Sequence, residues 1–305
     1  MTILPPYLEK GDSIGIVAPA GFMPFEKMES CINTLQDWGF NVQLGTTTQS
    51  SSENYFSGSD DERLNDLQRM MDDSSIKAIL CARGGYGMSR IIDNISFKKF
   101  KKNPKWIIGF SDITVLHAHI YSKYKIASLH APMAAAFNDN EYNNPYVRSL
   151  KAALEGVPAN YEILPHRFNK TGDGEGELIG GNLSLLGHLI GTKSDIKTKN
   201  KILFLEDIGE YIYNIDRMLI QMKRAGKFDK LAGLIFGGFT EAKDTERPFG
   251  MTTEQVIHEK IKGFDFPVCF NFPVSHDKEN YALKIGAGYK FSVSLNSVML
   301  VEQVL

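Results

Sequence analysis

The chain has 305 residues, enough for about two domains of ordinary size. Its 34 basic and 36 acidic residues leave a net charge of −2, which argues against proteins that hold nucleic acid or anionic membranes by charge. Three scattered cysteines without CxxC spacing, Cys31, Cys81 and Cys269, exclude a disulfide scaffold and a thiolate zinc site. The first residues carry no secretory pattern and no apolar run is as long as a membrane helix, so we expect a cytoplasmic protein.

Apolar strand-like runs alternate with helical patterns through the first half of the chain. Strands are predicted over 13–18, 41–44, 78–81, 106–108 and 127–129. Helices are predicted over about 28–38, 59–71 and 112–121, the second of them opening with the capping box of Ser59 and Glu62. This alternation predicts an α/β fold with a doubly wound parallel sheet, Rossmann- or flavodoxin-like, whose ligands bind at the carboxyl ends of the strands.

The second half has a different pattern. A polar stretch over 137–144 and a helix ending near Gly156 come first, and 171–176 (TGDGEG) is typical of a loop that ends an interdomain connection. Strands over 201–205 and 231–236, a helix between them, and strand-like runs from Tyr281 onward make this half richer in sheet. We therefore predict an N-terminal α/β domain over 1–160 and a sheet-rich α/β domain over 161–305.

Ser111 is the candidate nucleophile. It lies between the apolar run 106–108 and a helix predicted to begin at Asp112, with Gly109 giving the turn room. A serine on such a sharp strand-to-helix turn projects its hydroxyl from the end of the sheet, beside helix N–H groups that can stabilise an oxyanion. The match to G-x-S-x-G is incomplete, because Ile113 stands where the second glycine would be. A plain helix cap therefore stays open as the alternative.

A serine nucleophile needs a base, and two histidines directly follow predicted strands: His130 and His276. His117 and His119 lie too far along the helix after Ser111, and His188 falls in a helical apolar pattern typical of a packing residue. His166 and His258 lie in polar surroundings without a motif. On the residues alone, either of the two candidates is more often a structural histidine than a base. The third member of a triad would be a carboxylate that fixes the imidazole tautomer.

Three carboxylates compete for that third role. Glu206 follows the apolar strand 201–205 and so lies at the carboxyl edge of a sheet, with Asp207 and Glu210 as close rivals. A carboxylate at this place could also simply cap the next turn, so the choice among the three stays open on the residues alone.

Seven stretches, taken in order, resemble the LD-carboxypeptidases, the serine peptidase family S66 that trims muropeptides. They are LEKGDSIGIVAPAG (8–21), ARGGYG (82–87), IIGFSDITVLHAHI (107–120), LHAPM (129–133), GELIGGNLSLLGHLIGT (176–192), FLEDIGEYIYNIDRML (204–219) and SHDKENYALKIGAG (275–288). Because they run through both halves in one order, the resemblance covers essentially the whole chain.

The resemblance implies a Ser–Glu–His triad of Ser111, Glu206 and His276, in a site between the two domains. It also implies an oxyanion hole made by backbone N–H groups of Asp112 and of the Gly84–Gly85 turn, with Gly85 as the turn's donor. Gly84 would contact the substrate. Arg83 is the cation nearest this loop: it could bind the free carboxylate of the substrate through two hydrogen bonds, or equally form a salt bridge at the end of the strand. His130 then becomes a residue that lines or supports the pocket.

Two residues depart from the family's usual pattern. Ser275 stands before His276 where a glycine is common, and Lys284 falls in the final apolar run. Both leave the triad intact and bear on how the substrate fits.

The function that the resemblance implies is release of the terminal D-alanine from a murein tetrapeptide in cell-wall recycling. It requires no metal or other cofactor, takes a small muropeptide as substrate, and suggests a homodimer. The alternative within the fold is a self-immunity amidase of the microcin C type, which would be expected to stack an aromatic ring on adenine; 240–253 offers Phe249 but no Trp.

Readings from other classes stay weaker. A two-domain binding protein without chemistry is usually exported. A thiol enzyme would have to use Cys81, which the pattern places in an apolar strand, and 15–21 (GIVAPAG) lacks the spacing of a dinucleotide-binding loop.

Overall fold

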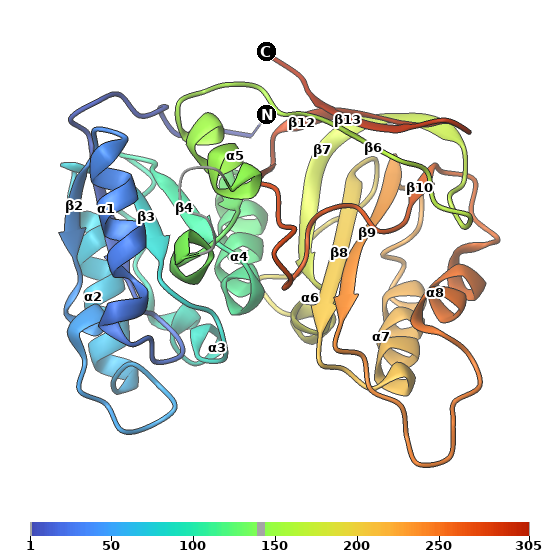
Figure 1. Cartoon of the computed structure of the whole chain (residues 1–305), viewed down its shortest axis with the longest axis horizontal. Coiled ribbons are helices and arrows are strands. Elements are labelled where there is room, and N and C mark those ends of the chain that lie inside the picture. The colour runs from blue at the N-terminus through green and yellow to red at the C-terminus, as the bar shows by residue number, and fades with distance from the viewer. Residues whose placement is uncertain (1, 139–143, 305) are drawn as a thin grey trace. The chain divides into compact units, whose positions relative to one another are not determined.

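The computed structural model describes residues 2–138 and 144–304 (Figure 1). The chain forms two compact units, Met1–Val157 with Tyr281–Ile285, and Pro158–Asn280 with Gly286–Leu305. The sequence predicts a single domain boundary near residue 160. In the structure the chain instead returns to the first unit at Tyr281–Ile285. Part of the polar stretch expected over 137–144 lies outside the described residues.

The first unit is built on a six-stranded sheet in the order β11-β5-β4-β3-β1-β2. Its strands are β1 (Ser13–Val17), β2 (Asn41–Leu44), β3 (Ile76–Cys81), β4 (Trp106–Gly109), β5 (Ser128–His130) and β11 (Leu283–Ile285). All are parallel except β11, which pairs antiparallel with β5 at one edge. The parallel order 2-1-3-4-5 is flavodoxin-like, which confirms the predicted fold class and puts the reversal of strand order between β1 and β3.

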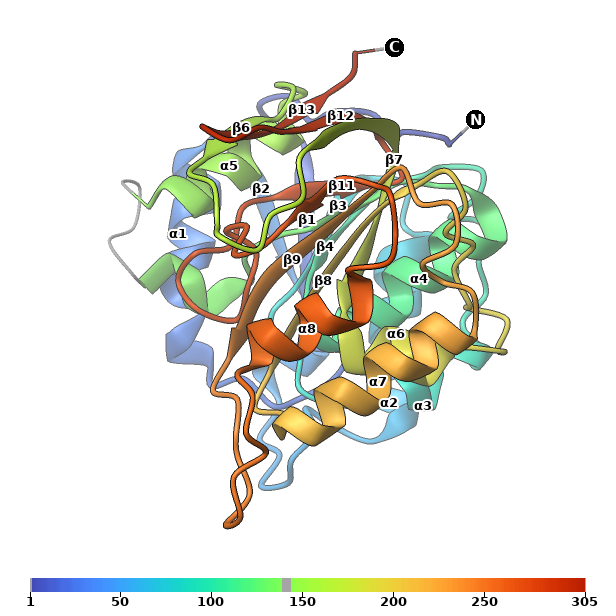
Figure 2. The same ribbon diagram turned by 90° about the vertical axis from the view of Figure 1, so that its right-hand side faces the viewer.

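Helices cover both faces of this sheet (Figure 2). They are α1 (Glu29–Asp37), α2 (Asp60–Asp72), α3 (Met88–Ile91), α4 (Thr114–Tyr124) and α5 (Pro145–Leu154), with 3-10 turns η1 (Phe25–Lys27), η2 (Thr46–Gln49), η3 (Ile92–Asn94), η4 (Ser111–Ile113) and η5 (Ala134–Asn138). Alternate strand residues such as Ile14 and Ile16 pack with Leu35 of α1 and Leu150 of α5 in one core. Because both faces of the sheet centre are buried, the central strands β1, β3 and β4 are almost continuously apolar.

The second unit has a seven-stranded sheet in the order β10-β9-β8-β7-β12-β13-β6. Its strands are β6 (Asn160–Ile163), β7 (Gly172–Asn182), β8 (Ile202–Ile208), β9 (Gly233–Thr240), β10 (Val268–Cys269), β12 (Gly288–Val293) and β13 (Val298–Glu302). The long β7 joins its two halves: it pairs parallel with β8 and antiparallel with β12. The second unit is therefore the sheet-rich α/β domain that was predicted.

The loop predicted over 171–176 is wrong, since 172–176 form the first half of β7. Glycine alternates there with acidic residues, and the glycines face a neighbouring backbone. A side chain at Gly174 would overlap the Ala232 carbonyl oxygen, and one at Gly176 would come within 2.7 Å of the Asn200 carbonyl oxygen. The strand needs glycine for close approach, which the sequence pattern presents as a turn signal.

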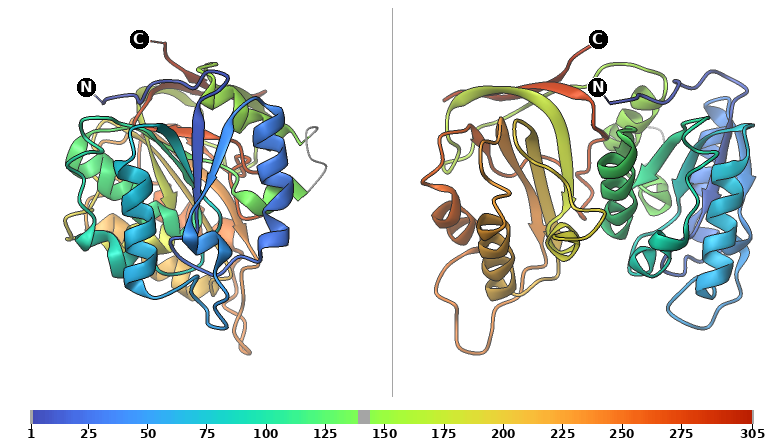
Figure 3. Two further views of the ribbon diagram at one scale, coloured as in Figure 1. Left: turned by 90° about the vertical axis from the view of Figure 1, so that its left-hand side faces the viewer. Right: turned by 180° about the vertical axis from the view of Figure 1, so that it is seen from behind.

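Three helices complete the second unit: α6 (Leu183–Leu189), α7 (Ile212–Arg224) and α8 (Thr253–Ile261). The view from behind in Figure 3 shows α7 beside α8. Gly226, with φ 70°, follows the end of α7 as predicted. Among the described residues, no helix has the length and apolar character needed to cross a bilayer.

Candidate active site

Ser111 occupies a strained turn at the carboxyl end of β4. Its φ of 61° is left-handed, a conformation that serine rarely adopts and that costs about 1–3 kcal/mol. The chain then enters η4 and α4, so the predicted sharp strand-to-helix turn is confirmed, although its first turn is 3-10. This is the geometry that lifts a nucleophilic hydroxyl clear of a sheet edge.

The Gly84–Gly85 turn lies directly against Ser111. A side chain built on Gly84 would come within 2.9 Å of the Ser111 Cβ, 3.1 Å of its Oγ and 3.3 Å of the Asp112 backbone nitrogen. Gly85 has φ 96°, which a side chain would strain. Bare backbone at both positions lets the turn approach the serine, as an oxyanion hole requires.

The Asp112 carboxylate binds the backbone at Met88, where the loop that contains Gly84 and Gly85 ends. It is almost fully buried, and its Oδ2 accepts the Met88 backbone N–H at 2.8 Å. Burial raises the pKa of Asp112 to about 6, against the opposing effects of its backbone hydrogen bonds and the Arg63 charge. The side chain is thus committed to positioning 87–88, while the backbone nitrogen of the same residue would lie 3.3 Å from a side-chain carbon built on Gly84.

Arg63 holds the same turn from the other side. Its buried guanidinium donates from Nη1 to the carbonyl oxygens of Pro19 at 2.7 Å and Gly87 at 3.2 Å, pairs with Asp60, and lies over the Phe56 ring. Sequence reasoning missed this residue. The available signal was its spacing, because Arg63 shares the buried face of α2 with residues three, four and seven positions further on.

Arg83 lies beside the same loop but is already partly engaged. Its exposed side chain donates from Nη1 to the Phe22 carbonyl oxygen at 2.7 Å. This contact fixes one arm of the guanidinium near Gly21. It stays a prediction that the other N–H donors of Arg83 bind the carboxylate of a substrate.

Glu206 and His276 form a close pair in the second unit. The Oε2 of Glu206 lies 2.6 Å from the Nδ1 of His276, and the glutamate is fully buried while the histidine side chain is 11% exposed. Because Nδ1 faces the carboxylate, proton transfer by this ring would pass through Nε2.

The environment of His276 favours its protonated form. Burial alone lowers the pKa of His276, but the Glu206 hydrogen bond and the charges of Glu206, Asp207 and Asp277 outweigh it and raise the pKa above the ordinary value. A carboxylate paired with an imidazole stabilises the imidazolium that forms when the ring accepts a proton. The pair is therefore suited to general base chemistry.

A bulge between β8 and β9 brings this pair together. The register shifts between Leu205 and Asp207, opposite Gly237 and Gly238. The Gly238 N–H donates to the Val274 carbonyl oxygen at 3.0 Å, and a side chain on Gly238 would come within 2.6 Å of the Ser275 Cβ. The two glycines thus let the segment leading to His276 run close beside β9.

Ser275, the departure from the usual glycine, shapes the turn that carries His276. Its Oγ accepts the Asp277 N–H at 3.0 Å and donates to the Glu279 carbonyl oxygen at 3.0 Å. The hydroxyl therefore contributes hydrogen bonds that a glycine could not make.

The rival carboxylates have other partners. Asp207 accepts hydrogen bonds from the Asn182 amide at 2.8 Å and the Ser184 N–H at 3.0 Å, so it holds the start of α6. Burial first, and then the Glu206 charge, raises the pKa of Asp207 to about 7. Glu210 accepts from the Asn214 amide at 3.0 Å. Of the three, Glu206 is the one seen to contact His276.

Two comparisons decide the family. Models of the LD-carboxypeptidase N-terminal and C-terminal domains match residues 14–131 and 175–291. The probable murein peptide carboxypeptidase of Bacillus subtilis (strain 168) is 37% identical over 286 residues, covering 93% of this chain and 89% of the relative. The chain belongs to the LD-carboxypeptidase family.

Solved structures agree with this LD-carboxypeptidase fold. The muramoyltetrapeptide carboxypeptidase of Oxalobacter formigenes has a TM-score of 0.87 and 25% identity, covering 96% of this chain and 99% of its own. The microcin C7 self-immunity protein MccF, in complex with aspartyl sulfamoyl adenosine, has a TM-score of 0.85 and 22% identity over 100% and 99% of the two chains. At that identity the likeness to MccF concerns the fold.

The other histidines of the LD-carboxypeptidase lie elsewhere. His130 is fully buried at the end of β5, with its ring 5.7 Å from that of Phe110. His117 lies against the Gly109 carbonyl oxygen at 2.8 Å, and burial lowers its pKa to about 4. The interpretation of His188 as a packing residue is wrong, because its side chain is exposed on α6.

Cys81 is buried in β3 of the LD-carboxypeptidase, and burial raises the pKa of its thiol. This opposes formation of the thiolate that a cysteine nucleophile needs. The thiol-enzyme alternative therefore loses its chemical basis.

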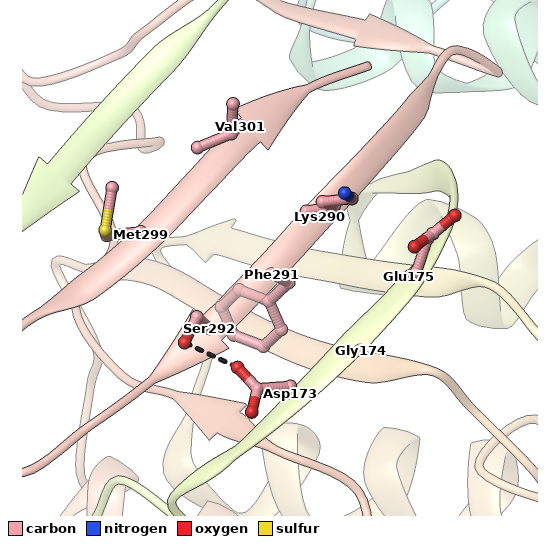
Figure 4. Close-up of a pocket in the computed structure, with 8 residues that line it drawn as sticks. All are labelled: Asp173, Gly174, Glu175, Lys290, Phe291, Ser292, Met299 and Val301. Atoms are coloured by element: carbon pink, nitrogen blue, oxygen red, sulfur yellow. Dashed lines mark hydrogen bonds between the residues drawn. The ribbon is translucent and has the colours of Figure 1, made fainter.

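A cavity of about 400 Å³ opens on β7, β12 and β13 of the second unit (Figure 4). Charged and polar side chains mark it, among them Glu175, Lys290 and Ser292, whose Oγ donates to Asp173 at 2.6 Å. Its lining includes none of the triad residues implied by the resemblance, so it is separate from the candidate site.

Proposed function

We propose that this LD-carboxypeptidase is a serine hydrolase that removes the terminal D-alanine from murein tetrapeptides during cell-wall recycling. The observation that carries the proposal is the left-handed Ser111 turn packed against Gly84. The names of the Bacillus and Oxalobacter relatives, a murein peptide carboxypeptidase and a muramoyltetrapeptide carboxypeptidase, support this choice of substrate.

The mechanism assigns one role to each triad member. The Ser111 Oγ attacks the carbonyl carbon of the bond to D-alanine while His276 accepts the hydroxyl proton, which gives a tetrahedral oxyanion. As the C–N bond breaks, His276 donates that proton to the departing amine and an acyl-enzyme remains. Water then attacks the ester with His276 again as base, which releases the shortened peptide. Glu206 orients the ring and stabilises its cation.

Backbone donors stabilise the oxyanion in this proposal. The N–H groups of Gly85 and Asp112 are the candidates, with Gly84 giving the space for the carbonyl to approach. Each such donor is typically worth a factor of about 10²–10³ in kcat. Arg83 supplies a cation for the free carboxylate of the D-alanine end, where a guanidinium can donate two parallel hydrogen bonds.

We further propose that the enzyme is a cytoplasmic homodimer, as the family resemblance implies. Sedimentation velocity at micromolar concentration tests the oligomeric part. A single species with twice the 34.1 kDa chain mass is expected, and a single species at the chain mass would contradict it.

Mass spectrometry of muropeptides tests the activity. Wild-type protein incubated with a murein tetrapeptide should release a product lighter by one alanine residue, and Ser111→Ala should release none while keeping its circular dichroism spectrum. Full activity of Ser111→Ala would contradict the mechanism.

A parallel incubation tests the self-immunity alternative with an aspartyl adenylate mimic that carries a cleavable amide. We expect no turnover, since the only support for a stacked adenine in 240–253 is Phe249, whose side chain is 37% exposed in a loop. Cleavage of the mimic in preference to the tetrapeptide would replace the proposed substrate.

A further inference from the structure

One buried histidine contacts the strand that leads to the proposed nucleophile. His117 lies on α4, and its side chain is almost fully buried. Its Nε2 lies 2.8 Å from the carbonyl oxygen of Gly109, which is the last residue of β4 and the second before Ser111. The ring therefore joins the helix that follows the serine to the strand that precedes it. The mechanism proposed above gives it no task.

The His117 ring is neutral and donates from Nε2. Burial lowers the pKa of His117 to about 4, against the raising effect of its bond to Gly109. A neutral imidazole has one N–H, and a carbonyl oxygen can only accept, so the proton is on Nε2. The buried Nδ1 makes no hydrogen bond with the residues that the structure describes. Among these residues, the hydrogen bond of the ring is thus directed to the strand end.

The Ser111 turn needs support of this kind. Its φ of 61° is rare for serine, and a strained residue persists only where its surroundings over-determine it. Gly84 lies close against the serine, but this contact leaves the strand behind the turn free to shift. The Gly109 carbonyl oxygen also accepts the Ala131 N–H, at a longer 3.3 Å. His117 thus supplies the shorter of these two bonds at the strand end.

The Gly109 carbonyl sets the direction in which the chain enters the turn. It belongs to the peptide plane between Gly109 and Phe110, and such planes are rigid, so fixing the oxygen fixes the whole plane. Phe110 is extended, with φ −149° and ψ −168°, and the chain becomes left-handed at Ser111. If this plane rotated, Ser111 could relax to negative φ, and its Oγ would leave the position from which it attacks.

We propose that His117 is a positioning residue for Ser111: its Nε2–H holds the Gly109 carbonyl and so keeps the serine in the left-handed conformation that presents its hydroxyl. The inference rests on the proposed function, because it takes Ser111 as the nucleophile. It gives a second histidine a part in the reaction, one that acts through the backbone and exchanges no proton with the substrate.

The test is the rate at which a fluorophosphonate labels Ser111, measured together with kcat and KM for the tetrapeptide. His117→Met fills the space without a donor. The labelling rate and kcat should each fall about 10–100-fold, which corresponds to the strain that a relaxed serine no longer bears, while KM stays unchanged. His117→Gln offers an amide N–H in place of Nε2–H and should restore most of both rates.

His119→Met is the matched control for lost packing. His119 is also buried on α4, but its ring stacks on Phe97, with centroids 5.1 Å apart. This variant should lose stability and keep the labelling rate of the wild type. The role of His117 would be overturned by a wild-type labelling rate in His117→Met. It would also be overturned by an equal loss in His119→Met, or by a loss in His117→Gln as large as that in His117→Met.

NMR on the wild type keeps the proposal testable if His117→Met does not fold. The Cδ2 chemical shift of isotope-labelled histidine should report the Nε2–H tautomer for His117, with slow exchange of that proton. The Nδ1–H tautomer would overturn the inference, since the Gly109 carbonyl would then have no donor in this ring. If Ser111 is labelled but no tetrapeptide is hydrolysed, the proposed substrate fails and the labelling rates still decide the role of His117. A wild type that is not labelled at Ser111 would overturn the serine mechanism and this role together.

Discussion

The two units hold their parts of the candidate triad by different means. Around Ser111 the backbone itself is shaped, with a left-handed serine, two glycines against it, and two buried charged side chains, Arg63 and Asp112, that fasten the facing turn. Around Glu206 and His276 one charged hydrogen bond of 2.6 Å sits at a strand irregularity. The Ser111 site thus depends on backbone shape, and the Glu206–His276 pair depends on charge. We therefore expect different substitutions to inactivate each of them.

The largest expected effect comes from removing the negative charge of Glu206 beside His276. Glu206→Gln keeps the shape but removes the charge, so the imidazolium loses its stabilisation and kcat should fall about 10⁴-fold, as in serine proteases that lose the corresponding carboxylate. Steady-state kinetics on the tetrapeptide measure it. Glu210→Gln is the matched control, because Glu210 bonds Asn214 instead, and should stay within a factor of about three. Equal losses in the two variants would show that the 2.6 Å contact is not the functional one.

The next effect breaks the shape-dependent part. Gly84→Ala would place a carbon 2.9 Å from the Ser111 Cβ, pushing the turn away, so kcat should fall about 10²–10³-fold, the usual value of an oxyanion donor. Gly263→Ala, where a side chain meets nothing within 4 Å, is the control and should keep full activity. Unchanged kcat in Gly84→Ala would remove this turn from the mechanism.

A third change tests whether buried charge maintains that shape. Arg63→Met leaves the Pro19 carbonyl oxygen without this donor, while Gly87 and Asp60 keep the bonds that they accept from Arg90, and it should cost about 1–3 kcal/mol of unfolding free energy. Urea unfolding followed by circular dichroism measures it. Arg69→Met, on the same helix but with its side chain 54% exposed, should cost less than about 1 kcal/mol. Comparable costs would mean that Arg63 does not fasten the turn.

The smallest expected effect is on the pH dependence of kcat/KM, which tests the role of charge at the Glu206–His276 pair. His276 must be neutral to accept the serine proton, and its pKa is raised, so kcat/KM should fall as pH drops through a midpoint above about 6.5. Glu206→Gln removes the main raising cause and should move that midpoint down. Asp207, whose pKa is raised to about 7, titrates in the same range, and Asp207→Asn distinguishes its contribution. A midpoint below 6 in the wild type would contradict the charge-dependent account.

The same contrast explains what the sequence could predict. The Ser111 turn is encoded locally, by an apolar strand, Gly109 and a helix start, and the doubly wound parallel sheet follows from the alternating strand and helix patterns, whereas the strand order comes from the structure. The choice of Glu206 over its neighbours depends on register across β8 and β9, and on the glycines that admit Val274 and Ser275. Such pairing over 70 residues is invisible to local patterns.

Two further misses have the same cause. The glycines of 171–176 serve strand contacts with distant backbone, and Arg63 is buried because distant carbonyl oxygens surround it. In both cases the partners that decide the structure come from elsewhere in the chain.

The central claim is that Ser111 is a nucleophile activated by His276, and covalent labelling tests it most directly. Wild-type protein treated with a fluorophosphonate should gain one adduct, which peptide mapping places on Ser111. His276→Gln should react at least about 100-fold more slowly, in line with the usual contribution of a general base. An adduct on another residue, or equal labelling rates in the two proteins, would contradict the account.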